Sequence, residues 1–375
     1  MGYLDSLRGF AANIVVWSHF VLSYQTPQVF ENFLTLPFLH LLWDGSAAVI
    51  LFFVLSGYVL SLKFFRNLNT RSLEFREIQE FVIVRLGRLW FPYVFAVGLS
   101  FIVKTLLFSP LDTVPAQTIW IKSFWQNETH FRHFLLENNL FFRPTLFTLL
   151  PHGWSLFFEM TISSLIPIAV FLSLRTALPL SIFALILVFK FGFPVFILHF
   201  LFGLLLAKQL KQYKSKPHWN SYSSSALLIV SLLLFSFRFS VIPYISTPVP
   251  NQWIEIIVGV GAAGIIYTAS VSLELQKFLN FSAFRYLGRI SYSLYLCHFF
   301  VLLAITPRVI RWTNTQLPGV WYWGWGVGIL FTTLFSWIIS IAINRLIEVP
   351  SLNFTKKVSK YARIGQSRAR VDKSK

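Results

Sequence analysis

The sequence has few of the residues on which soluble proteins rely for charge, cross-linking and metal binding. Cys297 is the only cysteine among 375 residues, which excludes an internal disulfide and any cysteine-rich metal site. Charged residues make up 12% of the chain, whereas 55% of the residues are hydrophobic and long apolar runs recur throughout it. This composition excludes a water-soluble protein and indicates a polytopic membrane protein without a separate soluble domain.

Two patterns are also absent from the chain. The N-terminus lacks a basic flank, an apolar run and a small-residue cleavage site in that order, so we expect no removable signal peptide and expect the first helix to belong to the mature protein. No internal repeat of fixed period is found. An inverted-repeat transporter, one of the classes that a polytopic protein suggests, therefore has no support from the sequence.

The apolar segments predict an all-α protein with about ten transmembrane helices, because each segment is long enough, or nearly so, to cross ~30 Å of hydrocarbon. The segments are 7–24, 46–63, 88–108, 154–174, 178–190, 193–210, 224–242, 253–272, 287–306 and 322–346. The fifth is short and is separated from the sixth by Lys190, Gly192 and Pro194, so these two are either separate spans or a kinked or re-entrant pair. We assign 1–350 to the transmembrane domain and 351–375 to a basic cytoplasmic tail.

The distribution of basic residues predicts the orientation. The net charge is +18, and lysine and arginine cluster in 63–88, 208–216 and the tail after Arg345, whereas the loops 25–43 and 243–252 contain none. The positive-inside rule places the basic loops and both termini in the cytoplasm, as an even number of spans requires. We therefore attribute the charge to topology and expect the lipid bilayer as a partner, with the tail on anionic headgroups and no nucleic acid bound.

Ionisable groups inside the first apolar segment are the strongest sign of function. Arg8 and His19 are 11 residues apart, which returns to within about 20° of the same helical face, roughly 16 Å further along the axis. Such groups are costly in a membrane and histidine titrates near neutrality, which favours a proton-transfer role for His19. The alternative is that Asp5 and Arg8 form an interfacial ion pair and that His19 only hydrogen-bonds a neighbouring helix.

A second polar stripe occurs in the ninth segment. Ser291 and His298 are seven residues apart, nearly on one face, and Tyr295 lies one turn before His298. The stripe predicts groups that face a site inside the helix bundle, while the alternative is polar packing between helices.

Two other segments carry charged groups near their ends. Ser155 and Glu159 are one turn apart, and a glutamate there needs a histidine, an arginine or a tyrosine hydroxyl as partner, or else water at the headgroup level. Arg85 and Arg88 have the spacing i and i+3 before the third span. Two guanidinium forks could bind a phosphorylated cytoplasmic ligand, although topological anchoring is the stronger explanation when they are taken alone.

The longest predicted non-cytoplasmic loop, 109–153, is aromatic enough to pack, and we expect it to fold over the outer mouth of the helices. Its His130 and His133 have the spacing i and i+3, but a third metal ligand is not evident. We therefore predict no metal site.

Five motifs occur in one order along the chain. They are RGFAA followed by His19, FFVLSGY at 52–58, RLGRLWFPY at 85–93, WSLFFE at 154–159 and SYSLYLCH at 291–298. Together with Glu348 and Pro350 in IEVPS, they resemble the membrane-bound acyltransferase family 3, also called the O-acetyltransferase type. The resemblance covers essentially the whole chain, which departs from the commonest pattern at Ser6, where glycine is usual, and at Phe158, where a second glutamate is usual.

The resemblance implies transfer of an acyl group, usually acetyl, from cytosolic acyl-CoA to a hydroxyl of a carbohydrate at or across the membrane. Acetyl-CoA would be a donor substrate and no cofactor would be bound permanently. Because the family's groups are carried over by position, His19, Glu159 and His298 are the implied catalytic residues, with His19 as general base or transient acyl carrier.

The remaining implied residues bind the substrates. Arg8, Arg85 and Arg88 would bind the donor, and we assign Ser155, Ser291 and Tyr295 to substrate binding. The expected location is a bacterial inner membrane. The rival interpretations are a transporter or flippase of glycan precursors and a non-catalytic scaffold.

Overall fold

The computed structural model describes residues 2–67, 74–109, 114, 116–126, 130–138, 148–212, 220–318 and 321–359. In these ranges the chain is helical, as predicted, with an isolated antiparallel bridge between Tyr24 and Gln117. The predicted tail falls largely on 360–375, which lies outside the described residues; its first nine residues, 351–359, are helical.

The helices of the described part are as follows. They are α1 (Gly2–Ser23), α2 (Gln28–Leu34), α3 (Pro37–His40), α4 (Gly45–Asn67), α5 (Phe75–Leu106), α6 (Ile119–Lys122), α7 (Phe131–Glu137), α8 (Gly153–Ser164), α9 (Ile166–Ser173), α10 (Leu178–Phe189), α11 (Phe196–Gln212), α12 (Ser221–Phe235), α13 (Phe237–Ser240), α14 (Asn251–Val271), α15 (Leu273–Leu279), α16 (Ser282–Phe300), α17 (Thr306–Gln316) and α18 (Trp321–Ile343). A short 3₁₀ helix covers Ile242–Tyr244, and π-helical turns cover Val301–Ile305 and Asn344–Glu348.

All ten predicted apolar segments are helical, but their number as membrane spans is not confirmed. Five helices in the described part are long and apolar enough to cross a membrane, or seven if the bent pairs α8–α9 and α12–α13 each count as one span. The difference has local causes: α10 has 12 residues and α11 has 17, while α1 carries Asp5 and Arg8. These apolar helices support an integral membrane protein. The count of ten spans and the cytoplasmic location of both termini stay predictions.

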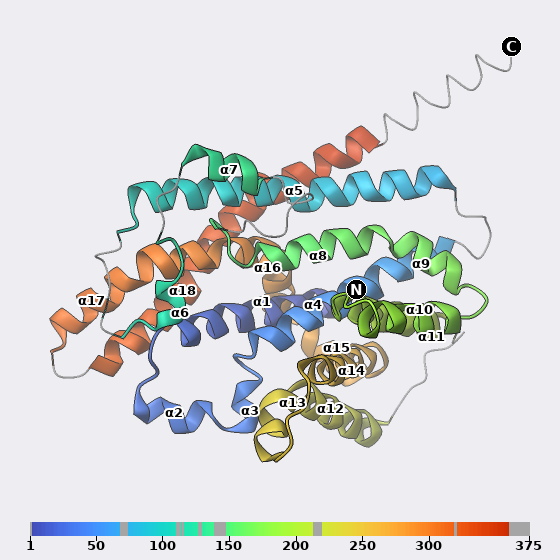
Figure 1. Cartoon of the computed structure of the whole chain (residues 1–375), viewed down its shortest axis with the longest axis horizontal. Coiled ribbons are helices and arrows are strands. Elements are labelled where there is room, and N and C mark those ends of the chain that lie inside the picture. Colours follow the sequence, from blue (N-terminus) through green and yellow to red (C-terminus); the bar gives the residue numbers. More distant parts are fainter. Residues whose placement is uncertain are drawn as a thin grey trace, which may run out of the picture.

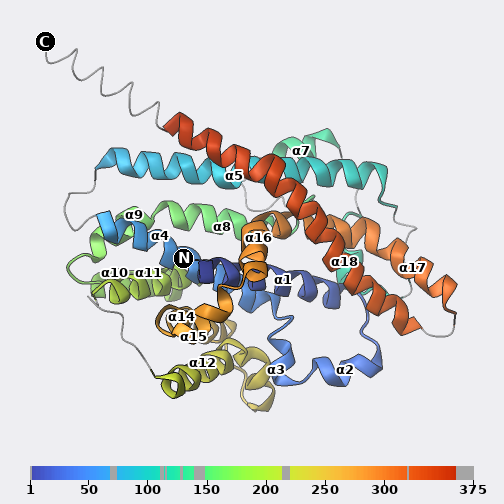
Figure 2. The same ribbon diagram turned by 180° about the vertical axis from the view of Figure 1, so that it is seen from behind.

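The helices form one bundle with α1 near its centre (Figure 1). α1 packs against α4 and α16, and α4 packs in turn against α11 and α14. α5 and α8 lie along one side of α1, and α12 to α15 lie along the other; the view from behind shows α18 and its continuation crossing α16 and α5 (Figure 2). The short helices α2, α6 and α17 lie toward one end of the bundle, while α3 packs against α13 (Figure 1). Two central helices, α1 and α16, therefore bring together residues from the two ends of the sequence.

Glycine pairs allow the central helices to approach closely. A Cβ atom on Gly9 would lie 2.6 Å from the backbone nitrogen of Gly288, and one on Gly288 would lie 2.0 Å from the carbonyl oxygen of Asp5. Gly57 and Gly203 allow the same between α4 and α11, where an added Cβ atom would lie 2.2 Å from a backbone oxygen. Membrane helices that lack a hydrophobic driving force for association use such small residues to gain packing contacts.

Glu348, in the IEVPS stretch near the end of the family motifs, joins the segment after α18 to α16. Glu348 is 8% exposed, and its carboxylate accepts hydrogen bonds from Ser293 at 2.7 Å and from Asn344 at 2.9 Å. Because a buried carboxylate is stable only when its oxygens are satisfied, this contact fixes α16 against the π-helical turn that follows α18.

Candidate active site

A hydrogen-bonded histidine pair joins α1 to α16. His19 Nδ1 lies 2.8 Å from His298 Nε2, and the two rings are stacked with centroids 5.0 Å apart. His298 Nδ1 is 3.2 Å from the carbonyl oxygen of Leu294, which can only accept a hydrogen bond. A neutral His298 therefore carries its proton on Nδ1, so that its Nε2 accepts from His19 Nδ1–H. This leaves the lone pair of His19 on Nε2, where it can take a proton.

A third histidine, His152, completes this cluster and was not among the predicted site residues. Its ring centroid lies 4.9 Å from that of His298 and 6.4 Å from that of His19. The side chain is 4% exposed, and neither ring nitrogen makes a hydrogen bond of good geometry to a described residue, although the Tyr295 backbone lies near the ring. The only sequence signal was its position two residues before the WSLFFE motif, because the two histidines that its ring meets are 133 residues earlier and 146 residues later in the chain. Such buried, unsatisfied nitrogens point to a ligand.

Glu137 on α7 fixes the segment that leads to His152. Its carboxylate is 2% exposed and accepts backbone hydrogen bonds from Thr148 at 3.0 Å, Leu149 at 2.7 Å and Leu150 at 2.6 Å, besides one from the Thr148 hydroxyl at 3.1 Å. Burial raises the pKa of Glu137, and these hydrogen bonds oppose the rise. The carboxylate thereby sets the backbone two residues before His152.

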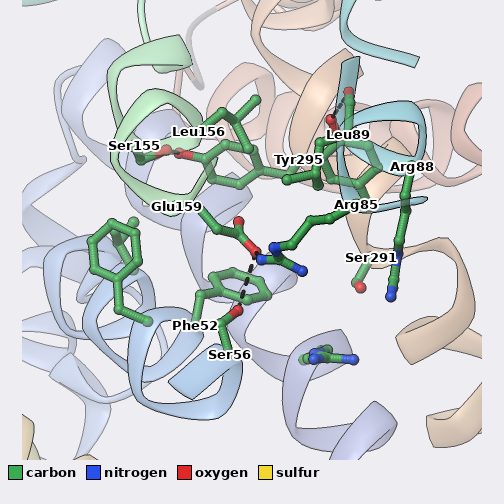
Figure 3. A pocket seen from close by; sticks show the side chains of 14 residues that line it. Phe52, Ser56, Arg85, Arg88, Leu89, Ser155, Leu156, Glu159, Ser291 and Tyr295 are labelled. Atoms are coloured by element: carbon green, nitrogen blue, oxygen red, sulfur yellow. Dashed lines mark hydrogen bonds and ion pairs between the residues drawn. The ribbon is translucent and has the colours of Figure 1, made fainter. Parts of the chain in front are cut away.

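Glu159 pairs with an arginine. Arg85 Nη2 lies 2.8 Å from Glu159 Oε1, and the Arg85 side chain is 7% exposed. Ser56 donates to the same carboxylate oxygen at 3.0 Å, and Arg85 Nε donates to Ser163. Figure 3 shows Arg85 and Glu159 pointing toward one another, with Ser56 bound to the same carboxylate oxygen. Of the partners considered from sequence, the structure thus selects arginine, and the catalytic role of Glu159 stays a prediction.

This ion pair lines a cavity of about 70 Å³, which we call the inner pocket. All three predicted donor-binding residues line it, as do all three predicted substrate-binding residues and Glu159. They are Arg8, Arg85, Arg88, Ser155, Ser291, Tyr295 and Glu159. The fold therefore gathers seven of the nine predicted site residues around one space, and the other two, His19 and His298, form the pair described above.

Ser155 and Tyr295 connect the inner pocket to His152. Their hydroxyl oxygens lie 2.6 Å apart, and both are within hydrogen-bond distance of the His152 carbonyl oxygen, at 3.0 Å for Ser155 and 3.3 Å for Tyr295. Both hydroxyls are buried. They therefore hold the His152 backbone as well as lining the pocket.

Arg8 also lines a second space of about 500 Å³, which we call the cationic cavity. Lys63 and Arg66 from the end of α4 line it too, and neither was among the predicted site residues; Asp5 is the acidic residue of this lining, against three cations. The Arg8 guanidinium lies 3.7 Å from the Asp5 carboxylate, so the ion pair considered from sequence is present, and Arg8 faces both spaces as well.

A third space, of about 160 Å³, lies beyond the inner pocket, and we call it the histidine cavity. His19, His152, Trp154 and Glu255 line it, and it shares Val49 and Tyr295 with the inner pocket. The three spaces thus adjoin in series through shared residues: cationic cavity, inner pocket, histidine cavity. They run from the first turns of α1 to its last turn.

The described part of the predicted outer loop packs at the histidine end of α1. The Trp120 ring on α6 lies 5.5 Å from the His19 ring, and the Thr118 hydroxyl donates to the carbonyl of Leu22 at 2.6 Å. In α7 the His133 ring accepts from the His130 backbone at 3.1 Å, as a helix cap. Among the described residues, no group of three or more His, Cys, Asp or Glu side chains has the arrangement of a metal site.

Comparisons with known proteins identify the family. The family model described as an acyltransferase domain matches residues 1–341. The chain belongs to this acyltransferase family. This confirms the resemblance inferred from the five motifs and supports the enzyme class. The match covers α1 to α17 and all but the last two residues of α18, so the histidine pair and all three spaces lie within the matched region.

One curated relative is similar over a short region. It is the O-acetyltransferase PaAT-1 of Phomopsis amygdali, 43% identical over 67 residues, which cover 16% of this chain and 14% of the relative. The chain thus matches a small part of that protein's length. No solved structure matches.

Proposed function

We propose that this acyltransferase moves an acyl group, usually acetyl, from cytosolic acyl-CoA to a hydroxyl group of a carbohydrate. The observation that carries the proposal is the series of three adjoining spaces, cationic at one end and lined by His19 at the other. Family membership and the partial similarity to an O-acetyltransferase support it, and they favour a transferase over the transporter that the sequence left open.

The cationic end suits the donor. Coenzyme A carries several phosphate charges, which need compensating cations next to a membrane. Lys63, Arg66 and Arg8 line the cationic cavity, and Arg88 continues the positive charge into the inner pocket. Arginine forks bind phosphate oxygens in a bidentate manner. Arg85 is already engaged by Glu159, so we assign phosphate binding to the other cations and a positioning role to the Arg85–Glu159 pair.

The histidine end suits the chemistry. The acceptor hydroxyl gives its proton to His19 Nε2 as its oxygen attacks the thioester carbonyl carbon; the C–S bond then breaks, and the protonated His19 returns the proton to the CoA sulfur. Such general-base help contributes ~10²- to 10⁴-fold in rate. His298 acts as a positioning residue, because its Nε2 holds the His19 ring in the required tautomer.

The membrane in which this happens stays a prediction. A bacterial inner membrane was expected from the sequence, and the pattern of basic loops together with a cytosolic donor requires only a membrane that faces the cytosol.

Labelled acetyl-CoA and a crude glycan fraction test the proposal with purified protein in detergent. We expect wild-type protein to transfer label, and His19→Ala to lose transfer by at least 100-fold while it still binds acetyl-CoA. His130→Ala is the matched control, because His130 is exposed on the loop and should keep full activity. Full activity of His19→Ala would remove His19 as the base, and failure of wild-type protein to bind acetyl-CoA would remove the function.

A further inference from the structure

The wall of the histidine cavity contains groups to which the chemistry above gives no role. Glu255 in the second turn of α14 and Trp154 at the start of α8 line the cavity with His19 and His152. A carboxylate accepts hydrogen bonds from two or more hydroxyl groups, and an indole offers a broad apolar face. Together they form a wall suited to a molecule that has both hydroxyl groups and apolar ring faces.

The position of Glu255 is fixed by a neighbouring helix. His199 on α11 is fully buried, and its Nε2 donates to the backbone carbonyl of Glu255 at 3.0 Å. α11 and α14 approach closely at this point, because a Cβ atom on Gly259 would lie 2.6 Å from the His199 ring. The carboxylate is therefore carried on a backbone that two packed helices hold in place.

An independent observation indicates that the cavity takes a polar ligand. His152 is 4% exposed and lines the cavity, and its two ring nitrogens make no hydrogen bond of good geometry to a described residue, although the Tyr295 backbone lies near the ring. Unsatisfied buried nitrogens are costly, so a turn of the His152 ring toward a hydroxyl group of a ligand in this space would be favourable.

The size and charge of the cavity limit the class of ligand that it can bind. Its volume of about 160 Å³ is close to the ~150 Å³ of a protein cavity that holds a benzene ring, so one six-membered ring fits. Among the described residues, those that line it include Glu255 and no lysine or arginine, in contrast to the cationic cavity. The Glu255 carboxylate interacts favourably with Arg238, which does not line the cavity. An anionic ring would still meet the carboxylate inside the cavity, in a medium of low dielectric constant, where like charges repel strongly.

We propose that the histidine cavity is the acceptor site and that it takes a neutral sugar ring, with one hydroxyl at His19 and another bound by Glu255. The proposal rests on the proposed acyl transfer and specifies its acceptor class. Glu255 then acts as a specificity residue that rejects uronic acids, and the same charge keeps the CoA phosphates from entering the cavity from the inner pocket.

Two probes of matched shape test the proposal: methyl β-glucopyranoside, which is neutral, and its glucuronide counterpart, which carries a carboxylate. Acetyl transfer to each is measured with wild-type protein, Glu255→Gln and the control Glu31→Gln, whose glutamate is exposed on α2. We expect wild-type protein to prefer the neutral probe at least tenfold. Glu255→Gln should raise the acceptor KM about tenfold and reduce the preference, because an amide loses the charge-assisted bonds and the repulsion.

A binding measurement that needs no catalysis completes the test. Ser46 is exposed and lines the cavity, while Cys297 is buried, so maleimide should label the Ser46→Cys variant at that position alone. The neutral probe should slow labelling at least tenfold and the anionic probe should not.

The two failures are distinguishable. Protection by the neutral probe without any acetyl transfer would refute the proposed function and leave the ring site standing. Three results would overturn the acceptor-site assignment. They are acetyl transfer by Glu255→Gln that equals that of wild-type protein, equal protection from labelling by both probes, and no protection by either probe.

Discussion

The substitution Glu137→Gln tests how the loop before α8 supports the site. In the structure, three of the four hydrogen bonds to the carboxylate end on Oε2 and one, from Leu150 N–H, ends on Oε1. A glutamine keeps most contacts by placing its oxygen at the Oε2 position. Its NH₂ group then faces the Leu150 N–H, so one buried donor is left unsatisfied.

The magnitude follows from that single donor. An unsatisfied buried donor costs ~1–3 kcal/mol, and the remaining bonds also lose charge assistance. The opening equilibrium of the segment Thr148–Leu150 should therefore increase by roughly 5- to 150-fold. His152 follows two residues later and its ring lies against His298, so a looser segment should lower kcat more than it changes the affinity for acetyl-CoA.

Hydrogen exchange followed by mass spectrometry measures the opening, and labelled acetyl transfer measures kcat. Arg132→Gln is the control, because Arg132 lies on the exposed face of the same helix. If the amide hydrogens of residues 148–150 exchanged at the wild-type rate in Glu137→Gln, and its kcat also equalled that of wild-type protein, the carboxylate would not support the site.

Two further predictions concern the donor and the topology. Arg88→Ala should weaken acetyl-CoA binding ~10- to 100-fold, and Arg88→Lys should recover only part of the affinity, because an ammonium cannot reproduce a bidentate fork. Titration in detergent measures the affinity. If both variants bound acetyl-CoA as wild-type protein does, Arg88 would be a topological anchor only. Tyr222→Cys and Tyr244→Cys, at positions 87% and 79% exposed, should react with an impermeant thiol reagent from opposite sides of sealed vesicles, with Cys297 buried as the internal blank. Labelling from one side would contradict the positive-inside orientation across α12–α13.

The sequence by itself determined the class of protein and its helices. Apolar composition indicates a polytopic membrane protein, and each apolar run that composition marks is helical in the structure, because a segment in hydrocarbon must satisfy its own backbone hydrogen bonds. The order of short motifs also identified the family, because each motif is a contiguous stretch of residues that can be read directly from the sequence. The count of spans did not follow as securely, because α10 and α11 are short and two other pairs are bent.

Only the tertiary structure decided which polar groups meet. His19 and His298 are 279 residues apart in sequence. They touch because glycines allow the backbones of α1 and α16 to come into direct contact. Glu159 had several possible partners in the sequence, and the packing of α5 against α8 selected Arg85. His152 gave no periodic signal, because it belongs to a loop whose course is set by Glu137. Periodicity reports which face of one helix is polar, whereas the partner of that face depends on which helices cross, and that is decided by contacts between residues distant in sequence.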